Sequence, residues 1–285
     1  MAQTNLSQDT TAVADSLHAM IERELTIYSC HEHKDKGYLN PSDPTMITAD
    51  DRMKLVDWCY SIADHCQHSR KTVASAMEMV DRFLLSTPSN SADTARVAYE
   101  AQRDPTKFQL LTITTLYISI KINENIVISS DLFADMCSSH ADIVVAEDIE
   151  DMERILLSGL SWRCRAPTAY LIGHTIMALI RPHADIPEAT WDFVIDEMKY
   201  LTELAVRDYY FSTERASTVA LAAIFNAVET SIKGPLQSLQ KVIEGFLLAT
   251  MDCFDLDHSI QINEARIRVK KYLYQDQEER WMNSV

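Results

Sequence analysis

The chain has 285 residues, of which 47% are apolar and 24% charged, and its formal net charge at pH 7 is −16. These proportions are ordinary for a globular protein, while the acidic excess disfavours a surface for nucleic acid or for an anionic membrane, because phosphate groups repel it. Only five residues are glycine, which disfavours tight β-hairpins and glycine-rich phosphate loops, and we therefore expect an all-α protein.

Helical spacing begins near the N-terminus, where apolar residues predict one helix over residues 13–28, followed by a polar linker. The eight prolines divide the rest of the chain into segments that mostly fit a helical period. A first series of five helices is expected at 50–66, at 71–86, after Pro105, at 129–139 and at 146–159. A second series is expected at 167–181, 187–206, 213–231, 235–250 and 260–274.

Two series of five helices indicate a structural duplication. The two halves share little residue identity, so the duplication is one of helix arrangement and not of sequence. We expect an N-terminal helix and linker over residues 1–46 and a first five-helix bundle over 47–163. A second bundle is expected over 164–275, and a tail over 276–285.

The run from Phe108 to Ile120 carries no charge and ends at Lys121. Its threonines and isoleucines favour a β-strand by propensity. The run is nevertheless longer than an ordinary strand, which has about 5–6 residues, and the neighbouring segments have helical spacing. A helix that is hydrophobic all round is a buried one, so we expect the central helix of the first bundle here.

Six dispersed cysteines without paired spacing indicate reduced thiols, which is typical of an intracellular protein. No apolar stretch approaches the ~20 residues that span a bilayer, and the first residues lack the features of a signal peptide. We expect an intracellular protein with no membrane partner.

Several short stretches resemble the cyclin family, and they occur in the family's order. The resemblance extends over about residues 47–275. The stretches are "RMKLVDW" (52–58), "VDRFLLS" (80–86), "FQLLTITTLYISIKINEN" (108–125), "DIEDMERILLSGLSW" (148–162), "APTAYL" (166–171) and "LTELAVRDYYFSTERASTVALAAI" (201–224).

The resemblance implies two consecutive cyclin folds and a non-catalytic regulatory subunit that needs no cofactor. Such a subunit binds and activates a cyclin-dependent Ser/Thr protein kinase as a heterodimer in cell-cycle control, and it also meets kinase substrates or inhibitors in the nucleus and cytoplasm. A transcription-linked cyclin or another cyclin-fold adaptor protein is the alternative. A helical scaffold or enzyme unrelated to kinases is a further one.

Lys121 and Glu153 are the candidate kinase-binding residues, joined by Glu124. From the residues alone, Lys121 is a helix-terminal lysine whose stem lies on apolar surface, and Glu153 is a solvated helix charge. The resemblance implies instead that the lysine binds backbone carbonyls of the kinase's regulatory helix and the glutamate binds its N–H groups. Family members usually carry two acids after the lysine, and here Asn123 replaces the first, leaving Glu124.

Arg52 and Asp81 match the family's buried ion pair between two packed helices. A structural role is expected for them, with direct contact to a partner as the alternative. Loss of one partner would leave an unpaired buried charge, which costs roughly 3–5 kcal/mol.

Leu55, Trp58 and Gln109 match part of a groove in which some cyclins dock peptides of their substrates. The family's apolar positions in this groove fall on Asp51 and Lys54. Charges there should weaken the binding of an apolar anchor, so we expect little docking by this route and a core position for Trp58.

The residue types of Cys30, His31, Glu32 and His33 suit a metal ion. Consecutive ligands cannot all converge on one ion, however, and no second cluster stands at zinc-finger spacing. We expect no metal site and no catalytic residue.

Overall fold

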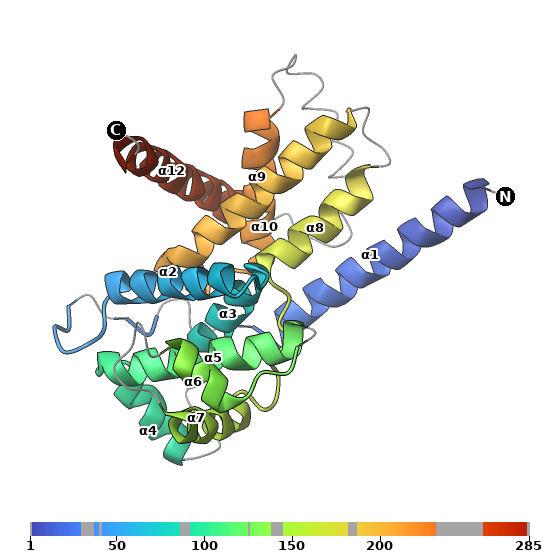
Figure 1. Ribbon diagram of the computed structural model, residues 1–285. Coiled ribbons are helices and arrows are strands. Elements are labelled where there is room, and N and C mark those ends of the chain that lie inside the picture. The colour runs from blue at the N-terminus through green and yellow to red at the C-terminus, as the bar shows by residue number, and fades with distance from the viewer. Residues whose placement is uncertain are drawn as a thin grey trace. The chain divides into compact units, whose positions relative to one another are not determined.

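The structure is a computed structural model that describes residues 2–29, 37–39, 42–85, 92–124, 126–137, 145–181, 187–231 and 259–283, with the backbone alone for 2–10, 231, 259 and 273–283. All regular elements in these ranges are helices, so the prediction of an all-α fold is confirmed (Figure 1). No helix in these ranges has the length and apolar character that crossing a membrane requires.

The chain divides into two compact units, one of which consists of Cys30–Ala166 together with Val206–Glu214. Among the described residues, six α-helices of this unit follow one another in the sequence, and a short 3₁₀ helix joins them from a later segment. They are α2 (Ala49–His65), α3 (Lys71–Leu85), α4 (Ala92–Ala101), α5 (Pro105–Asn123), α6 (Ser130–Cys137), α7 (Ala146–Gly159) and the short 3₁₀ helix η3 (Tyr209–Thr213).

Helix α5 is the centre of this unit, because it contacts α2, α3, α4 and α7. Every residue from Leu111 to Ile120 is buried, which confirms the prediction of a central buried helix over this run. The helix begins at Pro105, where the Asp104 side chain accepts a hydrogen bond from a backbone amide of the first turn. Its last turn contains Lys121.

The hydroxyl groups of α5 explain how this segment forms a helix although its residues favour a β-strand. Thr112, Thr114 and Thr115 each donate a hydrogen bond of 2.8–2.9 Å to a carbonyl oxygen three or four residues earlier in the same helix. Ser119 donates to the carbonyl of Thr72 on α3. The buried polar atoms are therefore satisfied within the helix and by its neighbour, which removes the cost of burying them.

Helix α4 is not among the predicted helices. Its buried residues, Thr94, Val97, Ala98 and Ala101, have helical spacing but small side chains, so their apolar stripe is a weak signal. The helix packs on α5 and α7. Gly159 of α7 permits this approach, since a Cβ atom there would lie 2.6 Å from the side chain of Thr94.

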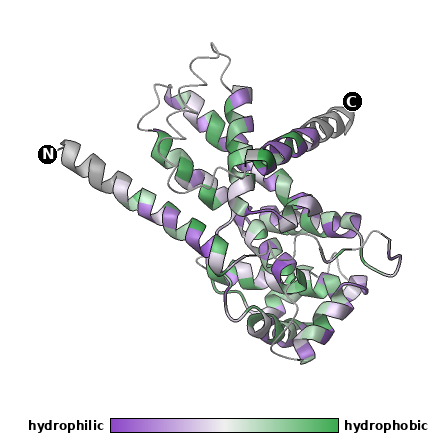
Figure 2. Cartoon of the chain, turned by 180° about the vertical axis from the view of Figure 1, so that it is seen from behind, coloured by the Kyte–Doolittle hydropathy of each residue, from purple (hydrophilic) through white to green (hydrophobic). Residues whose placement is uncertain are grey.

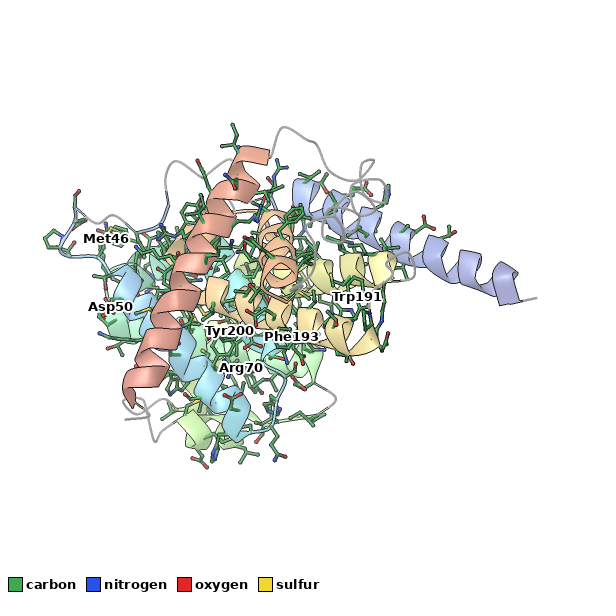
Figure 3. The ribbon with its side chains drawn as sticks, turned by 90° about the horizontal axis from the view of Figure 1, so that it is seen from above. Met46, Asp50, Arg70, Trp191, Phe193 and Tyr200 are labelled. Carbon is green, nitrogen blue, oxygen red and sulfur yellow. The ribbon has the colours of Figure 1, made fainter. Side chains whose placement is uncertain are left out.

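The other unit consists of Met1–Ser29, Pro167–Ala205 and Arg215–Val285. Within it, α8 contacts α1 and α10, and α10 and α12 lie side by side (Figures 1 and 3). The helix expected at 235–250 lies outside the described residues. Helix α12 continues past residue 276, where a tail is expected from the sequence. The expected domain boundaries stay predictions. The helices are α1 (Ala2–Thr26), α8 (Ala169–Ile180), α9 (Glu188–Arg207, whose last two residues belong to the first unit), α10 (Ala216–Ser231) and α12 (Ser259–Asn283).

Helix α1 is joined to its unit by an apolar stripe and one buried carboxylate. Hydrophobic and hydrophilic residues alternate around the helix (Figure 2), and Leu17 and Ile21 are buried. The Glu24 carboxylate accepts hydrogen bonds from the backbone amide and the hydroxyl of Ser217, at 2.8 and 2.6 Å. It thereby caps the first turn of α10, where a negative charge is favoured.

Candidate functional site

Lys121 and Glu153 form an ion pair that joins the end of α5 to the middle of α7. The Lys121 Nζ atom lies 2.8 Å from Oε1 of Glu153 and 3.1 Å from Oε2. The lysine side chain is 41% exposed and the glutamate side chain 16% exposed. The structure therefore brings together two candidate residues from different helices and leaves their charged ends within reach of a partner.

Apolar side chains lie exposed beside this pair. Ile126 is 45% exposed and Val127 is fully exposed. Tyr117 holds their segment next to Lys121, because its hydroxyl donates to the Ile128 carbonyl at 3.2 Å while its ring centre lies 4.6 Å from the ammonium. Sequence reasoning missed Ile126 and Val127, since an apolar pair between two helices is as typical of a core as of a surface.

Trp162 is a second exposed apolar group, at 75% exposure. It follows α7 in a turn where Ser161 and Trp162 both have positive φ angles, 52° and 61°. The turn is held in place by Arg82, which donates to the Arg163 carbonyl, and by Arg165, which donates to the Ile122 carbonyl at the end of α5. A tryptophan in this backbone region is uncommon, and its side chain is held out on a well-anchored turn beside the end of α5.

The carboxylate of Glu124 is directed to α3. Its Oε1 atom accepts hydrogen bonds from the Ser69 amide at 3.0 Å and from the Thr72 hydroxyl at 2.7 Å, where α3 begins. A carboxylate at a helix N-terminus stabilises that end through its unpaired N–H groups. Glu124 thus has a structural role in the free chain, and its contact with a kinase stays a prediction.

Arg52 on α2 and Asp81 on α3 form a buried ion pair. Two hydrogen bonds of 3.0 and 2.6 Å join them, and their side chains are only 2% and 8% exposed. Tyr38 donates to Asp81 at 2.7 Å, and Arg52 donates to the Val206 carbonyl at 2.7 Å. Burial lowers the pKa of Arg52, whereas the neighbouring Asp81 raises it, and the net effect is a rise. The pair is out of a partner's reach and connects segments far apart in the sequence.

Residues 15–165, just over half of the chain, match the family described as Cyclin, N-terminal domain. The chain belongs to the cyclin family.

Curated relatives with related sequences include cyclins of the A and B types. Cyclin-A1-2 of Arabidopsis thaliana is 26% identical over 184 residues, which are 65% of this chain and 37% of that protein. Cyclin-A3-1 of Oryza sativa subsp. japonica is 24% identical over 220 residues, 76% of this chain and 54% of that protein. G2/mitotic-specific cyclin-B3 of Mus musculus is 26% identical over 182 residues, 64% of this chain and 11% of that protein. The chain thus spans about half or less of the length of these relatives.

A solved structure shares the fold of this cyclin. The viral cyclin from herpesvirus saimiri superposes with a TM-score of 0.53 and covers 84% of this chain and 97% of its own, at 14% sequence identity. At that identity the likeness shows the fold alone.

The positions that the resemblance assigns to a docking groove include the charged residues Asp51 and Lys54 in this cyclin. Leu55 and Trp58 are partly buried against the core, and Gln109 is also partly buried. Asp51 accepts hydrogen bonds from Thr48 in the capping box that begins α2. Lys54 forms an exposed 2.6 Å ion pair with Asp50, which lies near the start of α2 (Figure 3). Weak docking by this route stays a prediction.

The described thiols of this cyclin are poor nucleophiles. Cys59 and Cys137 are buried, and burial raises the pKa of Cys137 to about 12, which keeps the thiol protonated at neutral pH. Cys30 to His33 lie outside the described residues. Within the described ranges no group of three or more His, Cys, Asp or Glu side chains is arranged to hold a metal ion. The absence of a metal and of a cofactor stays a prediction.

Proposed function

We propose that this cyclin is a non-catalytic regulatory subunit that binds and activates a cyclin-dependent Ser/Thr protein kinase. The observation that carries the proposal is the Lys121–Glu153 pair, which is accessible at the end of the buried α5 and is bordered by exposed apolar side chains. The resemblance to the family assigns both positions to contact with the kinase's regulatory helix.

The pair can exchange its internal hydrogen bonds for bonds to a partner. An ammonium group has three N–H donors and a carboxylate has about four lone-pair sites, so the two contacts between Lys121 and Glu153 leave further capacity on both. The end of a helix and its adjoining loop offer unpaired carbonyl and N–H groups. Charge-assisted bonds from Lys121 and to Glu153 would fix the position of such a helix.

The exposed apolar side chains would supply most of the binding free energy. Burying apolar surface contributes about 25 cal/mol per Å². Tryptophan is among the residues that most often dominate an interface, so Trp162, with Ile126 and Val127, is expected to be the main apolar contact.

Activation would follow from a shift between two conformations of the kinase. A free kinase whose regulatory helix is turned outward separates the glutamate of that helix from the lysine that positions ATP. A partner that binds only the inward position shifts the population toward it. In this mechanism the cyclin supplies a binding surface and no reacting group.

The test is co-purification with candidate cyclin-dependent kinases, followed by histone phosphorylation. Lys121→Ala/Glu153→Ala is expected to abolish both binding and stimulation while the protein stays folded. The matched control is Lys107→Ala/Glu147→Ala, which changes exposed residues of the same types in the first turns of the same two helices. Undiminished kinase binding by the folded first variant would refute the site, and no stimulation of any kinase by the wild-type chain would refute the function.

A role in cell-cycle control, in the nucleus and cytoplasm, is part of this proposal. It is supported by relatives named as A-type cyclins and as a G2/mitotic-specific B3 cyclin. The kinase that co-purifies tests this role, because a kinase of transcription would assign the chain to the transcription-linked cyclins instead.

A further inference from the structure

Helix α12 has an outer face that stays exposed. The side of the helix next to α10 is buried, with Ala265 fully buried and Val269 1% exposed. On the opposite side Ile260 is 67% exposed and Ile267 is 64% exposed. α12 and α10 lie side by side (Figure 3). Two large apolar residues are thus exposed on one face of α12, uncovered by the part of the chain that the structure describes.

The apolar residues of this face follow a seven-residue interval. Ile260 and Ile267 are seven residues apart, and Tyr274 and Trp281 continue the interval in the sequence. Residues spaced by seven stay near one line along a helix, which is the arrangement by which one helix packs against another. The face therefore suits a second helix.

Two charges of opposite sign border Ile267. Glu264 lies three residues before it and Lys271 four residues after it, and both side chains are exposed. Neither forms an ion pair within the described part of the chain, whereas Arg266 and Lys270 bind Glu229 of α10. Glu264 and Lys271 thus lie almost symmetrically about Ile267 along the helix.

We propose that two copies of this chain associate through the outer faces of their α12 helices, with the helices antiparallel and Ile267 meeting Ile267 of the second copy. A two-fold axis through this contact places Glu264 of each copy opposite Lys271 of the other. It also places position 260 opposite position 274 of the helix backbone, because both are seven residues from the centre. A parallel arrangement would bring like charges together, so charge complementarity selects the antiparallel one.

The contact is small, so the affinity between the two copies is expected to be low. The paired segment from Ile260 to Tyr274 is about 20 Å long, at about 1.5 Å per residue. One helix pair of this length buries less than the roughly 1,200–2,000 Å² of a standard interface. Association is therefore expected to depend on concentration, with the dimer growing as the protein concentration rises.

Sedimentation velocity of the full chain over a concentration series tests the proposal. Glu264→Lys and Lys271→Glu each place like charges opposite one another, and each is expected to weaken association by about tenfold or more. An equimolar mixture of the two variants regains complementary pairs and is expected to associate like the wild type. The double variant Glu264→Lys/Lys271→Glu is expected to do the same.

The control is Lys107→Glu, which changes the net charge by the same amount as Lys271→Glu at an exposed position of α5. It is expected to leave association unchanged, and circular dichroism verifies that each variant keeps its helix content. A wild-type chain that stays monomeric at its highest soluble concentration overturns the proposal. So does a mixture that associates no better than either variant alone, or a control as weak as Lys271→Glu.

Discussion

The side chains of Lys121 and Glu153 bind each other in the free chain, with the lysine Nζ 2.8 Å from the nearer carboxylate oxygen. The contact exists because α7 packs along α5 and brings the middle of one helix to the end of the other. A partner that binds both groups therefore competes with an existing ion pair. The net free energy of that exchange is smaller than the sum of the new bonds, which leaves the larger contribution to the apolar surface beside the pair.

The ion pair is expected to contribute little to folding. Because the Lys121 side chain is 41% exposed and water screens its charge, a double-mutant cycle with Lys121→Ala and Glu153→Ala should give a coupling of about 0.2–1 kcal/mol. Urea unfolding of the four proteins measures it. A coupling far above this range would contradict the assignment of the pair to binding.

The buried pair of Arg52 and Asp81 is expected to behave in the opposite way. Asp81→Ala leaves the buried guanidinium without its carboxylate and should lower the free energy of unfolding by about 3–5 kcal/mol. Arg52→Met/Asp81→Leu removes both charges and should recover much of this loss. Denaturant unfolding compares the variants, and a single variant as stable as the wild type would show that the pair is not structural.

Glu24 is expected to make stability depend on pH. Burial raises the pKa of Glu24 above its ordinary value, so the folded chain binds this proton more tightly than the unfolded chain. Its contribution to stability is then fully present below the unfolded pKa and is lost as the pH rises through the folded pKa. Glu24→Gln removes the titration and keeps an acceptor for Ser217.

The measurement for Glu24 is the unfolding free energy of wild type and Glu24→Gln over a pH series. The stability of the wild type relative to the glutamine variant should fall as the pH rises from below 4.5 toward neutrality. Groups common to both proteins cancel in this difference. A difference that is constant, or that rises with pH, would contradict the direction of the shift.

Trp162 is expected to lower the stability of the chain through its strained backbone and to strengthen kinase binding through its exposed ring. At its φ of 61° an L-residue is strained, so Trp162→Gly should be about 1 kcal/mol more stable than Trp162→Ala. Both variants should bind the kinase more than about tenfold more weakly, because the exposed ring is lost. Ser161→Gly is the control, since it relieves the same turn and keeps the tryptophan. Thermal unfolding and a kinase pull-down measure the two effects, and full binding by Trp162→Gly would exclude the ring from the interface.

Much of the fold follows from local patterns in the sequence. The uncharged run from Phe108 to Ile120 predicts a buried central helix, and α5 has that position because its threonine hydroxyls bond within the helix. Helix α4 escapes prediction, because its small buried side chains give too weak a stripe. Local spacing predicts a helix only where the buried side chains are large enough to be distinguished from the exposed ones.

The all-α class, most of the described helices and, through ordered motifs, the family resemblance can be predicted from the sequence. These features depend on residues within a few turns of one another, and hydrophobic period and family motifs both record such local relations. The folded structure is needed to see that Lys121 binds Glu153, that Glu124 binds the start of α3, and that Val127 and Trp162 are exposed. Burial and pairing between distant segments depend on how the helices pack, and no local pattern encodes that packing.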